Sequence, residues 1–305
     1  MRIAFLGTPT IAATVLEELL KDDLNIDAVV TQPDRPSGRG GKIQESAVKI
    51  IAQKNKIPVY QPGNKQELTT LIKELAPDLC IVAAYGMMIP DEALDAARYG
   101  MINFHPSLLP ELRGPSPIPM AIICGHNKTG VSIIQITKKM DAGDILAQSE
   151  VLLEGTETTP SLSSDLAKLG AKMLIKVVED IRDNRLEPAK QNEEKATFSP
   201  LIKKADGEIV FGEYHAKNIE QAARAFTPWP GIFTTWGGKK LELIEPQVVK
   251  GTYESGLVSC HEDKIIIGCV KDAIAPKFFK LEGKRLLTAK EFLCGYRNFI
   301  GSKLK

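Results

Sequence analysis

The chain has 305 residues, of which 43% are hydrophobic and 25% charged, and its formal net charge at pH 7 is +1. This length favours two domains, and the composition is that of a soluble globular protein with a sizeable core. A nearly neutral chain carries no overall field for a polyanion, so any nucleic-acid binding has to come from local patches.

The five cysteines are scattered and form no Cys-x-x-Cys pair. We therefore expect reduced thiols in a cytoplasmic protein, with neither a disulfide framework nor a zinc site. The chain opens on a strand pattern rather than on a signal peptide, and no apolar run approaches the length that spans a membrane. We expect no membrane attachment.

The first half alternates short apolar runs with segments of helical periodicity. Strands are expected at residues 2–6, 27–31, 59–60, 79–83 and 101–104, and helices at residues 11–20, 47–53, 66–75 and 92–97. This alternation predicts an α/β fold, an open and mostly parallel sheet with helices on both faces.

Two common nucleotide-binding motifs are absent from this half. The turn Gly7-Thr8-Pro9-Thr10 lacks the Gly-x-Gly-x-x-Gly fingerprint that lets a pyrophosphate approach the backbone. The glycine-rich run that ends at Lys42 is followed by Ile43, so the hydroxyl that a P-loop offers to magnesium is missing. A redox or ATP-binding role is therefore not expected.

Residues 32–44 are dense in prolines and glycines, which predicts an irregular loop. The basic residues of this loop are Arg35, Arg39 and Lys42, against the single acidic residue Asp34 before Gln44. A basic loop is suited to phosphate contacts. On composition alone, a solvated surface loop remains the alternative.

The strand at residues 101–104 leads into Asn103-x-His105, and Pro106 and Pro110 stop any further strand or helix. Asn103 and His105 are two residues apart, so their side chains leave the same face of an extended segment. Ligands of open α/β sheets bind where strands end. The amide and the imidazole are therefore a candidate catalytic pair, with a buried histidine beside a turn asparagine as the alternative.

A helix at residues 116–124 and a strand at residues 129–136 are expected next, followed by a polar turn that carries Asp141 and Asp144. A carboxylate can fix the tautomer of a histidine and raise its basicity. Either aspartate could serve His105 if the fold brings this turn to the end of the Asn103 strand. Both could equally be ordinary turn formers.

The second half begins with a long helix at residues 162–181 and a polar, aperiodic stretch at residues 187–204. Short strands are expected at residues 232–236, 240–244, 256–260, 265–270 and 277–281, with a closing helix at residues 288–296. Such strands favour a small β-barrel. We divide the chain into a first domain at 1–189, a linker at 190–207 and a second domain at 208–305.

The C-terminal part of the chain is basic. Residues 264–305 hold ten Lys or Arg residues and three Asp or Glu residues. A basic stripe on a barrel is typical of contact with a nucleic-acid backbone, and a merely solubilising surface is the alternative.

Taken together, Asn103-x-His105-Pro-Ser-Leu-Leu-Pro110, Arg113-Gly114 and Asp141-x-Gly143-Asp144 resemble the folate-dependent formyltransferase superfamily. The resemblance covers essentially the whole chain and is closest to the members that act on initiator tRNA. The further matching motifs are Gly7-Thr8-Pro9, residues 31–39, Ala84-Tyr85-Gly86, residues 224–230 and residues 283–290. Glu111 departs from the pattern, because relatives often carry a basic residue there, so a substrate contact at this position stays open.

The resemblance implies a Rossmann-like formyltransferase domain followed by an OB-like domain that helps to hold tRNA. It implies transfer of the formyl group of 10-formyltetrahydrofolate to the α-amino group of methionine on initiator tRNA, without a metal. Asn103 would donate to the developing oxyanion, His105 would carry the proton, and Asp141 would hold the imidazole or a water. Asp144 would shape the loop.

The resemblance also implies the binding residues. The folate would lie against Tyr85, Gly86, Met87, Ile89, Ser107, Leu108, Leu109 and Pro110, and the tRNA would meet Arg35, Arg39 and Lys42. We expect a monomer. Two alternatives remain: a sister enzyme that formylates a sugar nucleotide or another small amine, and a non-catalytic RNA-binding protein.

Overall fold

The computed structural model describes residues 1–37, 42–261 and 264–305. The chain forms two compact units. The first unit comprises Met1–Pro117, Lys128–Leu152 and Leu162–Ser199, and the second comprises Ile118–Asn127, Leu153–Ser161 and Pro200–Lys305. Residues 190–199, which we expected in a linker, belong to the first unit.

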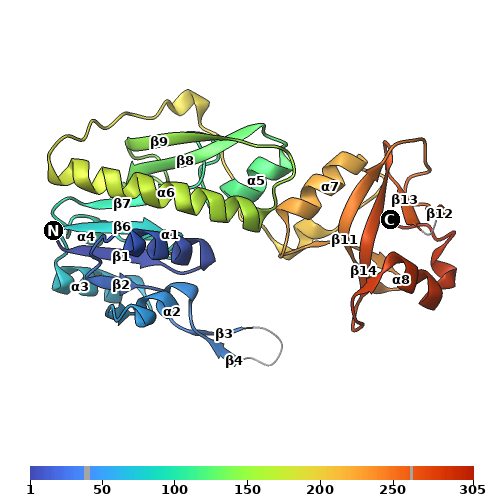
Figure 1. The fold of residues 1–305 in the computed structure, drawn as a ribbon, viewed down its shortest axis with the longest axis horizontal. Helices are drawn as coiled ribbons and strands as arrows, with labels where there is room; N and C mark the ends of the chain where they lie inside the picture. Colours follow the sequence, from blue (N-terminus) through green and yellow to red (C-terminus); the bar gives the residue numbers. More distant parts are fainter. Residues whose placement is uncertain (38–41, 262–263) are drawn as a thin grey trace. The chain divides into compact units, whose positions relative to one another are not determined.

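The first unit is built on a seven-stranded sheet with the strand order β5-β2-β1-β6-β7-β8-β9 (Figure 1). The strands are β1 (Ile3–Gly7), β2 (Ala28–Val30), β5 (Val59–Tyr60), β6 (Leu79–Ala83), β7 (Met101–His105), β8 (Lys128–Gln135) and β9 (Ile145–Leu152). The pairings from β5 to β7 are parallel, and those of β8 with β7 and β9 are antiparallel. The expected mostly parallel sheet is confirmed.

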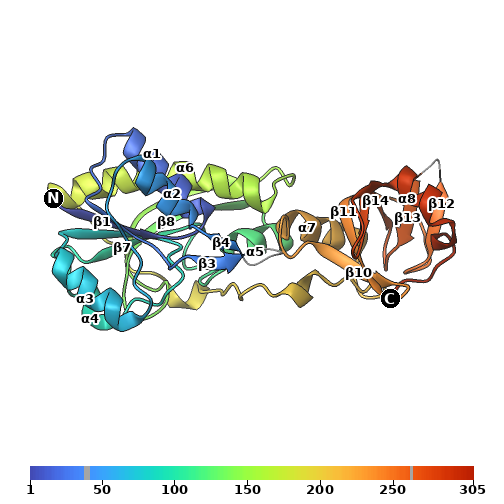
Figure 2. The same cartoon turned by 90° about the horizontal axis from the view of Figure 1, so that it is seen from below.

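Helices cover both faces of this sheet, as predicted. They are α1 (Thr10–Lys21), α2 (Ala47–Lys54), α3 (Lys65–Leu75), α4 (Asp91–Leu94) and α6 (Thr159–Arg182). Figure 2 shows α1, α2 and α6 on one face and α3 and α4 on the other. Gly170 brings α6 close to the sheet, because a Cβ atom there would lie 2.2 Å from the Phe104 ring of β7.

We expected an irregular loop at residues 32–44. This prediction is wrong for the two segments that pair as a hairpin. β3 (Arg35–Ser37) pairs antiparallel with β4 (Lys42–Gln44), and Pro36 faces Ile43 in the register. A proline is tolerated in a ribbon of two edge strands, because its missing N–H can face away from the partner. Arg39 lies outside the described residues, and so does the side chain of Lys42.

The second unit contains an antiparallel sheet with the strand order β10-β11-β14-β13-β12, and β15 pairs with β14. Its strands are β10 (Ile232–Trp236), β11 (Lys239–Val249), β12 (Val258–His261), β13 (Lys264–Gly268), β14 (Ala273–Leu281) and β15 (Leu287–Thr288). The helices are α5 (Pro117–Ile123), which begins in the first unit, α7 (Ala216–Ala225) and α8 (Ala289–Gly295). We did not predict α7.

An aromatic cluster holds α8 against the sheet of the second unit. Phe292 of α8 stacks on Phe279 of β14 with ring centroids 4.9 Å apart, and it also meets Trp236, Tyr296 and Phe299. A capping box starts the helix, since Thr288 accepts from the Glu291 N–H and Glu291 accepts from the Thr288 N–H. Within the described ranges, we find no helix with the length and apolarity needed to cross a membrane.

Candidate active site

The predicted pair of polar residues lies at the carboxyl end of β7. Asn103 pairs with Val82 of β6 and Ile134 of β8, and His105 pairs with Ser132 of β8. The His105 side chain is buried and that of Asn103 is half-buried. Among the described residues, the Asn103 amide has no hydrogen-bond partner. Its two N–H donors are therefore free to meet a ligand.

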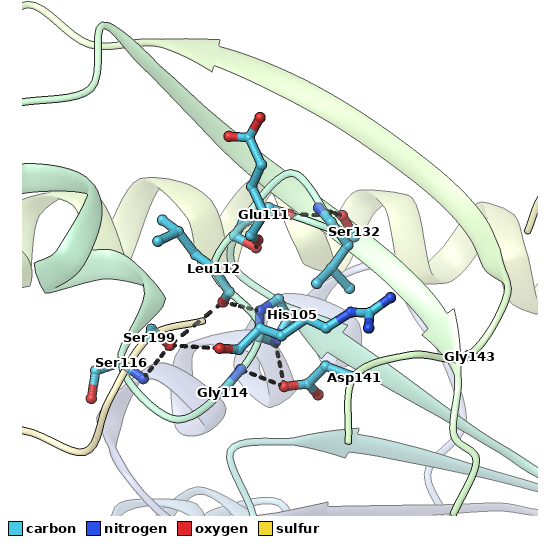
Figure 3. A network of polar contacts seen from close by, with 12 residues as sticks. His105, Glu111, Leu112, Gly114, Ser116, Ser132, Asp141, Gly143 and Ser199 are labelled. Carbon is cyan, nitrogen blue, oxygen red and sulfur yellow. Dashed lines mark hydrogen bonds and ion pairs between the residues drawn. The ribbon is translucent and has the colours of Figure 1, made fainter. Parts of the chain in front are cut away.

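The protonation of His105 follows from its contacts. Its Nε2 atom lies 3.1 Å from the Leu112 carbonyl oxygen (Figure 3). A carbonyl only accepts, so Nε2 carries the proton and Nδ1 of the neutral ring carries a lone pair. Burial lowers the pKa of His105 below its ordinary value, opposed by the Asp141 carboxylate and the Leu112 carbonyl. The ring is therefore neutral at pH 7, with Nδ1 ready to accept a proton.

The structure brings Asp141 to this histidine. The Asp141 Oδ2 atom lies 3.7 Å from His105 Nδ1 and accepts a hydrogen bond of 2.8 Å from the Gly114 N–H (Figure 3). Asp144 contributes its backbone instead, because its carbonyl accepts from the Gln135 N–H at 3.0 Å. Of the two aspartates that the sequence left open, Asp141 presents its carboxylate to the imidazole.

The turn after His105 is tied to the neighbouring strands. The Ser132 hydroxyl of β8 donates to the Ser107 carbonyl at 2.7 Å and accepts from the Leu109 N–H at 3.0 Å. Ser107 and Leu109 are buried, whereas Leu108 and Pro110 are half-buried. Hydrogen bonds to β8 therefore fix the backbone of the turn that carries these four expected folate residues.

The other expected folate segment follows β6. β6 and β7 are parallel neighbours, so this segment leaves the sheet at the same edge as His105. The Tyr85 carbonyl accepts from the Thr8 hydroxyl at 2.8 Å, while the buried Tyr85 phenol has no described partner. Burial raises the pKa of Tyr85 to about 12, so the phenol stays a donor. Met87 and Ile89 are half-buried against the core beneath the segment.

Sequence reasoning missed a group of supporting residues in the polar stretch at 187–204. Arg113, which is only 1% exposed, donates to Gln191 and Glu193 through four hydrogen bonds of 2.7 to 3.1 Å. The hydrogen bonds with Arg113 and then Lys139 hold the pKa of Glu193 at about 2. Only the Arg113-Gly114 motif pointed here, because its partners lie about 80 positions away in a segment without periodicity.

The same stretch also holds the backbone of the loop that bears Leu112. The Leu112 N–H donates to the Thr197 hydroxyl at 2.8 Å, and the Ser199 hydroxyl lies 3.1 Å from the Arg113 carbonyl (Figure 3). Gly114 has a φ of +113°, and a Cβ atom there would lie 2.5 Å from the Ser199 carbonyl. A glycine is therefore required where the two segments meet.

The hairpin β3–β4 is anchored at both of its ends by one ammonium group. Lys49 Nζ lies 2.5 Å from Asp34 Oδ2, just before β3, and 3.0 Å from Glu45 Oε1, just after β4. Gln61 adds a hydrogen bond of 2.8 Å to Asp34. Arg35 is exposed on the hairpin, at 3.3 Å from Gln32 Oε1.

Geometry and charge suit this site to acyl transfer. It combines a free amide donor, a neutral imidazole whose Nδ1 lone pair faces Asp141, and a carboxylate that stabilises the imidazolium. Over the described part of the chain, we find no cluster of three or more His, Cys, Asp or Glu side chains arranged to hold a metal ion.

Comparisons with known proteins cover both units. Residues 1–178 match the family described as "Formyl transferase", and residues 201–297 match "Formyl transferase, C-terminal domain". A methionyl-tRNA formyltransferase of Bacillus cereus is 39% identical over 316 aligned positions, covering 100% of this chain and 98% of the relative. One of Geobacter metallireducens is 36% identical, with the same coverage.

Solved structures share the fold at lower identity. HypX from Aquifex aeolicus in complex with tetrahydrofolic acid has a TM-score of 0.66 and 18% identity, covering 98% of this chain and 48% of HypX. An N-formyltransferase from Helicobacter canadensis, in complex with folinic acid and dTDP-3-aminofucose, has a TM-score of 0.68 and 18% identity. The match covers 90% of this chain and 98% of the Helicobacter canadensis chain.

Proposed function

The chain belongs to the formyl transferase family and, within it, to the methionyl-tRNA formyltransferases, and we infer that it formylates the amino group of methionine on charged initiator tRNA. Full-length relatives at 36–39% identity favour this reaction over the formylation of a sugar nucleotide or another small amine. The donor is a folate that carries the formyl group, and we propose the 10-formyl form of tetrahydrofolate. We also propose a cytoplasmic location, which a charged tRNA as substrate supports.

The proposed site is the cluster of Asn103, His105 and Asp141, in a first domain at 1–189. The observation that carries it is that Asp141, from a separate segment, lies 3.7 Å from His105 at the end of β7, the strand on which Asn103 precedes His105 by two residues. An α-amino group is about one-tenth neutral at pH 7, so it needs no strong base to attack. What the protein has to supply is stabilisation of the oxygen on which charge develops and a route for the proton.

Each residue has a task that its position and chemistry support. Asn103 donates its free N–H groups to the formyl oxygen as negative charge develops there. His105 accepts the proton of the attacking amine at Nδ1 and returns it to the leaving nitrogen. The Asp141 carboxylate, held by the Gly114 N–H, stabilises the imidazolium that forms in between.

The residues along the sheet edge fit a folate. The donor would supply the electrophilic formyl group. The unpartnered Tyr85 phenol is one buried polar group that a heterocycle with several acceptors could satisfy. Gly86 has a φ of +83°, and no described atom beyond its chain neighbours lies within 4 Å of the position of a Cβ atom, so its backbone is open to a flat ligand. Ser107, Leu108, Leu109 and Pro110 would form the neighbouring wall.

We also propose that the hairpin β3–β4 meets the acceptor stem of the tRNA. Arg35 is exposed on it, and Arg39 and Lys42 add positive charge in the sequence. Phosphate contacts by such residues position a nucleic acid without reading its bases. In the second domain, at 208–305, the basic C-terminal stretch at residues 264–305 would also contact tRNA phosphates.

One assay tests the proposal. The protein is incubated with 10-formyltetrahydrofolate and charged initiator tRNA, and N-formylmethionine is measured after hydrolysis of the ester. In parallel, an amino-sugar nucleotide replaces the tRNA. Formylation of the tRNA that falls steeply with salt supports the proposal, because phosphate contacts are lost as salt rises. Formylation of the amino sugar alone would support the alternative instead.

A further inference from the structure

We propose that Gln191 is a positioning residue for the reaction: its side-chain amide holds the turn that carries Asp141 and thereby sets the carboxylate against His105. The inference rests on the proposed function, since it gives Gln191 a task only if Asp141 and His105 take part in formyl transfer. Gln191 lies in the polar stretch that we had interpreted as a linker.

The contacts of Gln191 use its whole hydrogen-bonding capacity. Its Nε2 atom donates to the Asp141 carbonyl at 2.8 Å and to the Gly143 carbonyl at 2.7 Å. Its Oε1 atom accepts from Arg113 Nε at 3.1 Å and from Arg113 Nη2 at 2.7 Å. The guanidinium has only donors and the two carbonyls only accept, so the amide has one satisfactory orientation.

The turn needs to be held because its backbone is unfavourable. Asp141 has a φ of +50°, in the left-handed region that side chains rarely adopt. On its other side the turn presses against β8, where a Cβ atom on Gly143 would lie 1.7 Å from the Gln135 carbonyl. Gln191 donates hydrogen bonds to the carbonyls on either side of Ala142 and so keeps Asp141 in this conformation.

The same amide also holds the loop that meets the Asp141 carboxylate. Arg113, fixed by Gln191 and Glu193, directly precedes Gly114, whose N–H donates to Asp141 Oδ2 at 2.8 Å. Gln191 therefore joins the two segments whose meeting sets the 3.7 Å distance between Asp141 Oδ2 and His105 Nδ1. Without its donors, Asp141 can relax to the right-handed region and turn its carboxylate away from His105.

Two variants distinguish the donor function of the Gln191 amide from its acceptor function. Gln191→Glu keeps the length and offers oxygens to Arg113, but a carboxylate cannot donate to the carbonyls of Asp141 and Gly143. Gln191→Met removes every hydrogen bond. The matched control is Asn192→Ala, because the one hydrogen bond of the Asn192 side chain within the described residues is accepted from the Glu194 N–H, away from Asp141 and Arg113. Thermal melting establishes that each variant is folded.

We expect both Gln191 variants to lower kcat for formylation of charged tRNA by roughly 10-fold to 100-fold, since a displacement of about 1 Å in a catalytic group has an effect of this size. The KM values for tRNA and folate should stay within about twofold, because no substrate contact is lost. Asn192→Ala should match the wild type. A folded Gln191→Glu protein with the kcat of the wild type would overturn the inference.

A double-mutant cycle tests whether Gln191 acts through Asp141. In the Asp141→Asn background, Gln191→Glu should lower kcat by less than about twofold, because the group that it positions has already gone. Effects that multiply would contradict the inference. If the wild type forms no N-formylmethionine, or if Asp141→Asn leaves kcat unchanged, the proposed function or the role of Asp141 fails. If Asp141→Asn lowers kcat and Gln191→Glu does not, this inference alone fails.

Discussion

The Nδ1 atom of His105 lies 3.7 Å from the Oδ2 atom of Asp141, outside hydrogen-bonding distance and well within the range of a strong electrostatic interaction. The carboxylate is bonded to the Gly114 N–H instead, and the imidazole to the Leu112 carbonyl. Asp141 therefore favours the protonated ring by its charge while burial disfavours it, and the balance leaves His105 neutral until a proton is delivered.

The pKa of His105 should lie below its usual 6.5 in the folded protein, because burial outweighs the neighbouring carboxylate. Asp141→Asn removes the charge that raises this pKa, so the midpoint should fall further. An NMR titration of the ring protons measures both midpoints, with His105→Gln to assign the signal among the four histidines. A midpoint that rises in Asp141→Asn would contradict this account of the site.

The same shift has a consequence for stability. The pKa of His105 is lower in the folded state than in the unfolded state, so the unfolded state takes up a proton more readily. The neutral ring therefore contributes to the free energy of unfolding above pH 6.5. This contribution is lost as the pH falls below 6.5. Urea unfolding should therefore show a weaker decline toward acid pH in His105→Gln than in the wild type.

Arg113→Lys should destabilise the first unit. An ammonium cannot reproduce the fork of four hydrogen bonds to Gln191 and Glu193, and losing one bond of a charged group costs roughly 1.5–3 kcal/mol. Urea unfolding measures the change. Arg182→Lys is the control, because Arg182 is exposed and its ion pair in the described part of the chain is with the adjacent Asp183. Equal midpoints for the two variants would show that the buried guanidinium contributes nothing.

Gly143→Ala should reduce kcat at least tenfold, because an added Cβ atom would lie 1.7 Å from the Gln135 carbonyl and would push the turn with Asp141 away from β8. Gly212→Ala is the matched control, since no atom of the described residues beyond its chain neighbours lies within 4 Å of its Cβ position. Steady-state kinetics on charged tRNA compares the two. A Gly143→Ala enzyme with normal kcat would mean that the position of this turn does not matter for the chemistry.

Lys49→Met should raise the KM for charged tRNA and leave the KM for the folate unchanged. Lys49 bonds to Asp34 and Glu45 at the two ends of the hairpin β3–β4, so its loss frees the segment that we propose meets the acceptor stem. Lys54→Met, at the end of the same helix, is the control. A change in folate kinetics instead would assign the hairpin to the other substrate.

The sequence predicted the parts of the fold that repeat an apolar pattern. The buried runs of β1 and β6 are continuous, as expected for strands covered on both faces, and β7 is buried except at the half-buried Asn103. The spacing of Asn103 and His105 predicted that both side chains leave the same face of this strand. β9 was missed because it is only partly buried, and α7 because Ile219 is the one large apolar residue among its buried positions.

Prolines also misled the prediction. We ended the strand at residue 244 and began another at residue 277, but β11 and β14 continue through Pro246 and Pro276, which face each other in the register. The supporting role of the stretch at 187–204 could not be foreseen. Gln191, Glu193 and Ser199 act through contacts with Arg113 that only the folded chain creates.

The most direct test of the proposed chemistry is the single-turnover rate of formyl transfer to charged initiator tRNA by Asn103→Ala. The free amide of Asn103 is the proposed donor to the developing oxyanion, and the loss of such a donor typically lowers a rate by about 10²–10³. We predict a loss of this size in a protein that remains folded and still binds both substrates. A rate within about threefold of the wild type would contradict the assignment of the active site to the end of β7.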